Sequence, residues 1–89
     1  MLIPEPSSKF KRDLKRFKHN QDIIDELHEV IQILCYKKKM PAKYQDHSLT
    51  GNYVRHRECH IKPDTLLIYF TDDKYLYLER IGSHSDLFK

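Results

Sequence analysis

The sequence predicts an α+β fold in which two N-terminal helices pack on one face of a small antiparallel sheet. The N-terminal half carries apolar residues at helical spacing, and the C-terminal half carries apolar runs typical of strands, separated by short turns. The expected order is β-α-α-β-β-β, in two layers. We expect residues 1–89 to form one small domain.

The chain begins with a short edge strand, expected at residues 2–4, because two prolines follow closely and stop it. A first helix is expected over residues 8–18, starting at a serine cap, Ser7 or Ser8. Its apolar residues fall at helical spacing: Phe10, Leu14 and Phe17.

A second helix is expected from a cap at Asn20 or Asp22 to about Cys35. Its apolar residues recur at the spacing of one buried helix face: Ile23, Leu27, Val30, Ile31 and Leu34. This stripe predicts that the helix lies against the sheet.

The remaining chain predicts a meander. Residues 37–46 are expected to form a loop interrupted by Pro41, and Gly51-Asn52 a turn. The three strands are expected at residues 53–61, 66–70 and 75–81, with turns at 62–65 and 71–74. Such short connections imply antiparallel pairing. The last residues, 82–89, are expected to form a tail that packs back through Leu87 and Phe88.

The sheet face away from the helices is expected to be open and concave. Alternation along the first long strand places Cys59 and Ile61 toward the helices and His60 toward the open face. The third long strand conflicts with simple alternation, because Leu76 and Leu78 share the phase of Arg80. A bulge or a partly covered face is therefore predicted there.

The composition is mildly basic, with a formal net charge of +3. Cationic residues gather in two clusters, Lys9, Lys11, Arg12, Lys15 and Arg16 in the first helix and Lys37, Lys38 and Lys39 after the second. Each cluster suits a phosphate backbone, an acidic protein partner or plain solvation. The two cysteines lie far apart without metal-binding spacing, which favours reduced thiols in a cytoplasmic protein. No signal peptide or membrane-spanning segment is apparent.

Residues able to handle RNA gather in the C-terminal half: His47, His60, Asp64, Arg80, His84 and Phe88. Histidines exchange protons near neutral pH, and an arginine beside them can hold a phosphate. In a meander the ends of the first and third strands meet at one edge, so His60, Asp64, Arg80 and His84 are expected to share a rim. His47 would approach from the loop before the sheet.

A metal site is not expected. His56 and His60 lie four residues apart, which on a strand separates them by about 13 Å. No cofactor of any kind is implied by the sequence.

Three ordered blocks of the chain resemble the RelE/ParE superfamily of bacterial type II toxins, and most closely its YafQ branch. They are Asp46-His47-Ser48-Leu49-Thr50-Gly51, then Arg57-Glu58-Cys59-His60-Ile61-Lys62-Pro63-Asp64, then Arg80-Ile81-Gly82-Ser83-His84-Ser85-Asp86-Leu87-Phe88. The resemblance implies a RelE-like microbial ribonuclease fold and a ribosome-dependent endoribonuclease that cuts mRNA in the A site. It also implies a cognate antitoxin protein as partner, with the ribosome and mRNA as targets.

The resemblance assigns the catalytic residues to His47, His60, Asp64, Arg80 and His84, with Phe88 as the terminal aromatic. We expect Arg80 to hold the phosphate, His84 to act as general acid, and His60 or Asp64 to supply or orient the base, with His47 assisting. Phe88 would stack on a base or brace the tail. Thr65 departs from the family, which often carries an aromatic or aliphatic residue there.

Two other readings remain open on the sequence alone. A ParE-like toxin would act on a protein such as gyrase and would need no proton transfer. A toxin remnant would only bind its antitoxin.

Overall fold

The computed structural model describes residues 1–88 of the chain, apart from the side chain of Asn52; Lys89, at the end of the predicted tail, lies outside the described residues. The strands are β1 (Ile3–Pro6), β2 (His47–Ser48), β3 (Arg57–Lys62), β4 (Thr65–Thr71) and β5 (Tyr75–Gly82). The α-helices are α1 (Ser8–Leu14), α2 (Gln21–Cys35) and α3 (His84–Leu87), and the 3-10 turns are η1 (Lys15–Phe17), η2 (Ala42–Tyr44) and η3 (Gly51–Tyr53).

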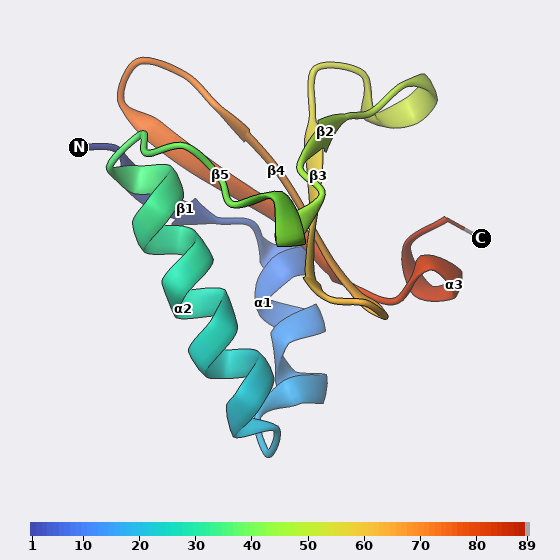
Figure 1. Cartoon of the computed structure of the whole chain (residues 1–89). Helices are drawn as coiled ribbons and strands as arrows, with labels where there is room; N and C mark the ends of the chain where they lie inside the picture. The colour runs from blue at the N-terminus through green and yellow to red at the C-terminus, as the bar shows by residue number, and fades with distance from the viewer. Residues whose placement is uncertain (89) are drawn as a thin grey trace.

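The strands form one sheet in the order β1-β5-β4-β3-β2. All neighbours are antiparallel except β1, which runs parallel to β5. Figure 1 shows α1 and α2 together on one side of this sheet and α3 beyond the end of β5. The predicted α+β class is therefore confirmed, with the predicted N-terminal edge strand running parallel to β5. The predicted end of that strand at residue 4 is wrong, because β1 includes both prolines and ends at Pro6.

Both helices begin where side chains cap them. The hydroxyl of Ser7 accepts a hydrogen bond from Phe10 N at 2.9 Å, and the side chain of Asn20 accepts one from Ile23 N at 3.3 Å. The first helix is shorter than expected, because α1 ends at Leu14 and the chain continues as the tighter turn η1.

The predicted start of the first long strand at residue 53 is wrong. Residues 51–53 form η3, and Arg55 has a left-handed φ of 75°, so the extended strand begins only at Arg57. His47 was expected in a loop, but it lies in the two-residue strand β2, directly opposite Glu58 of β3. Pairing with β3 thus fixes the position of His47.

The main core lies between the helices and the sheet. Its fully buried side chains include Val30 of α2, Cys59 of β3 and Leu67 of β4. The prediction that the face away from the helices is open is wrong in part. Leu66 and Ile68 are buried on that face beneath Leu87, Leu49 and Tyr53. The apolar run Leu66–Phe70 suits a strand that is covered on both faces.

The predicted irregularity in β5 is a β-bulge. Ile68 pairs with Arg80, whereas the next residue, Tyr69, pairs with Leu78, so Glu79 has no partner in β4. The extra residue allows Leu78 and Ile81 both to enter the helix-side core. Arg80 falls opposite Ile68, on the other face of the sheet.

Candidate active site

Glu58 stands between two of the predicted histidines. Its Oε1 lies 3.5 Å from Nε2 of His47 and 3.5 Å from Nε2 of His60, and the Glu58 residue is only 3% exposed. The three residues share one face of β2 and β3, because His47 pairs with Glu58 and His60 follows two residues later. A buried carboxylate thus holds two imidazoles that become its ion-pair partners when protonated.

His47 is fixed from both sides. Its Nδ1 lies 2.7 Å from the carbonyl oxygen of Gln45, and since a carbonyl only accepts, Nδ1 carries the proton in this contact. The other nitrogen, Nε2, faces Glu58. In the cationic form of His47 both N–H groups would therefore have an acceptor.

The residue before His47 anchors this strand to the sheet. Asp46 accepts hydrogen bonds from Arg57 Nε at 2.6 Å and from the hydroxyl of Tyr69. Burial, reinforced by the bond to Asp46, raises the pKa of Tyr69, so that hydroxyl remains a donor at neutral pH. The Asp46 carboxylate therefore holds β2 in place from the helix side, while His47 points to the opposite face.

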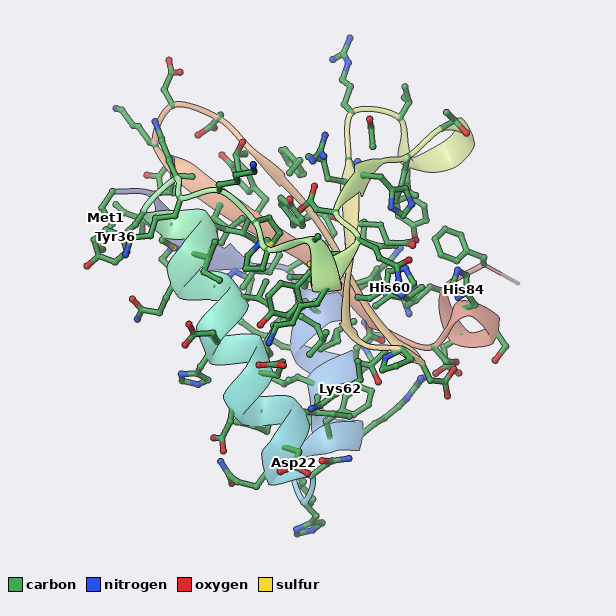
Figure 2. All side chains as sticks on the ribbon, viewed as in Figure 1. Met1, Asp22, Tyr36, His60, Lys62 and His84 are labelled. Atoms are coloured by element: carbon green, nitrogen blue, oxygen red, sulfur yellow. The ribbon has the colours of Figure 1, made fainter. Side chains whose placement is uncertain are left out.

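His84 reaches the cluster from a short helix that sequence reasoning described only as a tail. Ser83 and Asp86 form a capping box at the start of α3, and Arg16 of η1 lies 3.2 Å from Asp86. The ring centroid of His84 is 6.2 Å from that of His60. Figure 2 shows the two side chains on the side of the sheet away from α2.

Arg80 is held by an acidic residue of the first helix. Asp13 accepts hydrogen bonds from Arg80 Nε at 2.6 Å and Nη2 at 3.0 Å, and also from Ile81 N at 3.2 Å. The bonds to Asp13 raise the pKa of Arg80, so its guanidinium remains cationic. Both side-chain bonds to Asp13 use Nε and Nη2, and a further hydrogen bond with Tyr53 also favours the cationic form of Arg80.

The remaining predicted site residues lie at different distances from this cluster. Phe88 is 42% exposed, and its ring centroid is 5.7 Å from that of His84 and 5.9 Å from that of Tyr53. Asp64 is exposed in the turn between β3 and β4, and its side chain makes no hydrogen bond or ion pair with the described part of the chain. Thr65 is buried, with 6% exposure, at the start of β4.

The predicted basic clusters occupy two surfaces. Lys9, Lys11 and Arg12 lie on α1, and Lys15 and Arg16 on η1, all exposed. Lys37, Lys38 and Lys39 follow the end of α2 and are exposed as well.

Two positioning carboxylates, Glu58 and Asp13, were missing from the predicted site. Glu58 carried a usable signal, because alternation places it on the same strand face as His60. Asp13 carried none, since its partner Arg80 lies 67 residues away in the sequence.

The arrangement supplies the elements of acid–base phosphate chemistry. His47 and His60 share one carboxylate and His84 lies beside His60, while Arg80, a cation fixed by Asp13, comes from the β5 position that pairs with Ile68. Proton donors and acceptors near a guanidinium suit the cleavage of a phosphodiester that carries its own nucleophile.

Comparisons with known proteins agree on one family. The family model described as the bacterial toxin of the type II toxin–antitoxin system, YafQ, matches residues 2–89. The mRNA interferase toxin YafQ of Escherichia coli K12 is 34% identical over 85 residues, covering 94% of this chain and 92% of that protein. These matches favour the ribonuclease expectation over the gyrase-directed alternative.

Solved structures agree with the fold as well. A metal-bound toxin from Helicobacter pylori is 42% identical, with a TM-score of 0.90, over 99% of this chain and 100% of that one. YafQ in the E. coli DinJ–YafQ toxin–antitoxin complex is 32% identical, with a TM-score of 0.86, over 99% and 98% of the two chains.

The donor set of this chain does not fit a metal ion in the described geometry. Within residues 1–88, no group of three or more histidine, cysteine, aspartate or glutamate side chains is placed to hold one. Among the described helices, none has the length and apolar character needed to cross a bilayer.

Proposed function

The chain belongs to the YafQ family of toxins of bacterial type II toxin–antitoxin systems, and on that premise we propose that it cleaves mRNA held in the ribosomal A site. The family is one of mRNA interferases, so the chain is an enzyme, an endoribonuclease. The observation that carries the proposal is the histidine cluster on one sheet face, with Glu58 between His47 and His60 and with His84 beside His60.

The nucleophile in this reaction is the 2′-hydroxyl of the RNA itself. A base takes the proton of that hydroxyl, the oxygen attacks the adjacent phosphorus, and an acid protonates the departing 5′-oxygen. The products are a 2′,3′-cyclic phosphate and a free 5′-hydroxyl. Every step is a proton transfer or the stabilisation of charge on phosphate, which matches the side chains at the site.

We assign the general acid to His84 and the phosphate clamp to Arg80. His60 is the base, oriented by Glu58, and Asp64 is retained as an alternative source or support of the base from the neighbouring turn. His47, whose ring is held by the carbonyl oxygen of Gln45 and by Glu58, assists either proton transfer or phosphate binding. Phe88 flanks His84 with a half-exposed ring on which a base can stack.

The partners follow from charge and from the relatives. The cations of α1 and η1 and Lys37–Lys39 would contact RNA phosphates of the ribosome, so that binding weakens steeply with salt. YafQ of E. coli is found in complex with the antitoxin DinJ, and a cognate antitoxin is proposed for this chain too. A ribosomal target places the toxin in the cytoplasm.

Replacing His84 by alanine tests the catalytic assignment. The loss of one acid–base group should slow cleavage by about 10²–10⁴-fold while ribosome binding persists. The measurement is single-turnover cleavage of mRNA in ribosome complexes with a filled P site. His28→Ala is the matched control, because His28 is an exposed histidine on α2. Cleavage by His84→Ala at the rate of His28→Ala would show that His84 is not the acid.

The same assay separates the ribosome-dependent activity from plain ribonuclease activity. Naked mRNA of the same sequence should be cleaved far more slowly than ribosome-bound mRNA. Equal cleavage of both would mean that the ribosome contributes nothing to the reaction.

A further inference from the structure

The cations of the first helix divide between two of its faces. At 100° per residue along α1, Lys9 and Arg12 fall on one side of the apolar stripe and Lys11 falls on the other. In the tighter turn η1, at three residues per turn, Arg16 continues the first side and Lys15 the second. The first set lines a surface pocket of about 180 Å³ together with Asp13 and Arg80. The second set is not part of that pocket.

Arg80 links this pocket to the histidine cluster. Arg80 pairs with Ile68, so it occupies a position of the sheet face that carries His60. Its guanidinium donates a hydrogen bond to Asp13, which lines the pocket. Arg16, at the other end of the pocket, pairs with Asp86 of α3, the helix that presents His84. The pocket therefore adjoins two of the elements that carry the proposed catalytic groups.

The lining is arranged for an anion. Asp13, the one carboxylate in it, is already occupied by Arg80 and Ile81 N. Lys9 and Arg12 have no ion-pair partner among residues 1–88. Two unpaired cations beside the Arg80 guanidinium in one pocket form a strong attraction for a phosphate.

We propose that this pocket is a second phosphate subsite, which holds a phosphodiester of the mRNA strand next to the bond that is cut. The proposal rests on the proposed function, since it takes Arg80 to lie at the cut phosphate. A strand whose scissile phosphate meets Arg80 extends one nucleotide further along α1, where Lys9 and Arg12 bind the neighbouring phosphate. Lys11 and Lys15, on the opposite side of the helix, are left to other RNA.

The test combines mRNA in which one phosphate is made neutral with protein variants that each lose two positive charges. Single-turnover cleavage is measured on ribosome-bound mRNA carrying one methylphosphonate, placed either immediately before or immediately after the cut bond. The proteins are the wild type, Lys9→Gln/Arg12→Gln and the control Lys11→Gln/Lys15→Gln, which loses the same charge from the other face.

One of the two methylphosphonates should raise about tenfold the concentration of wild-type protein that gives half of the maximal single-turnover rate, as expected for a lost charged hydrogen bond. The same substitution should add nothing in Lys9→Gln/Arg12→Gln, because the contact is already gone. The tenfold effect should persist in the control protein. Equal methylphosphonate effects in all three proteins, or none at either position, would overturn the subsite.

A binding measurement keeps the subsite testable if cleavage itself fails. The free protein is titrated with a short RNA that is 2′-O-methylated at the cleavage position, over a range of salt concentrations. Each neutralised phosphate contributes about 0.7 to the logarithmic salt slope, so Lys9→Gln/Arg12→Gln, which gives up one phosphate, should lower the slope by about 0.7. An unchanged slope, or an equal drop in the control, would reject the subsite whatever the protein does to mRNA.

Discussion

Replacing Asp13 by alanine removes the carboxylate that joins the first helix to the end of β5. Three hydrogen bonds disappear, two from the Arg80 side chain at 2.6 and 3.0 Å and one from Ile81 N at 3.2 Å. Asp13 is 5% exposed and the Arg80 side chain 19% exposed, so little water can replace the lost partner. Breaking one side of such a pair costs about 3–5 kcal/mol, and we take about 3 because Arg80 keeps some solvent contact.

The orphaned N–H of Ile81 adds about 1 kcal/mol, giving an expected loss of about 4 kcal/mol in the free energy of unfolding. A domain of 89 residues has a total stability of about 4–13 kcal/mol. The variant should therefore lie near the limit of folding, with its Tm lowered by about 16–32 °C.

The assay is urea unfolding followed by circular dichroism, with thermal unfolding as a second measurement. Lys43→Gln is the control, because it removes an exposed ion pair to Glu26 at 3.7 Å and should therefore cost far less stability than Asp13→Ala. If Asp13→Ala lost no more stability than Lys43→Gln, the Asp13–Arg80 pair would not be what docks α1 on β5.

Three further predictions concern other polar groups. Hydrogen bonds from the backbone N–H groups of Lys74 and Tyr75 lower the pKa of Asp72 below 3.8. The Asp72 carboxylate should therefore stabilise the fold fully above about pH 4, and this stabilisation should vanish as the pH falls through the lowered pKa. Thermal unfolding of the wild type and of Asp72→Ala over this pH range measures the difference. Burial raises the pKa of Cys59, which is 0% exposed, so a thiol reagent should leave it unmodified in the native protein and modify it in denaturant. Asp46→Asn should slow cleavage by loosening the strand of His47 while costing only about 1 kcal/mol of unfolding free energy, measured by single-turnover kinetics and urea unfolding.

The elements that were predicted well are those whose signal is local. The periodic stripe of α2 and the capping side chain of Asn20 lie within the helix that they define. The apolar run of β4 and the short turns on either side of it define the antiparallel pairing in the same way. Such features depend on neighbours in sequence, and sequence patterns describe neighbours well.

The features that were missed depend on contacts between distant segments. The two-residue strand β2 exists because His47 and Ser48 find partners in β3, and nothing in so short a segment favours a strand by itself. The helix α3 is one turn long and is held by Leu87 in a second apolar cluster and by Arg16 at Asp86. Isolated turns of helix are unstable, so packing rather than propensity decides them.

The candidate site shows the same division. Alternation along β3 placed His60 on the correct face, and the structure brings His47 and His84 to it, as the rim argument expected for His84. The expectation that Asp64 joins them has no contact to support it, because the turn leaves its side chain in solvent. Turn geometry decides where such a residue points, and the sequence of the turn does not specify it.

The bulge at Glu79 explains how one strand serves both the core and the site. Before it, Leu76 and Leu78 face the helices; after it, Ile81 does, and Arg80 faces the other way. Regular alternation would require either the two leucines or Ile81 to leave the core. Because one extra residue resolves this conflict, the packing of the core suffices to explain the position of Arg80, whatever its proposed role in catalysis.

The first helix secures this bulge on both sides. The hydroxyl of Ser7 donates to the carbonyl oxygen of Glu79 at 2.8 Å while it accepts from Phe10 N, so one side chain both caps α1 and ties it to the bulge. Further along the helix, Asp13 binds Arg80 and Ile81 N. The basic helix is therefore more than a surface for RNA, because the carboxylate among its lysines and arginines determines where the proposed phosphate clamp points.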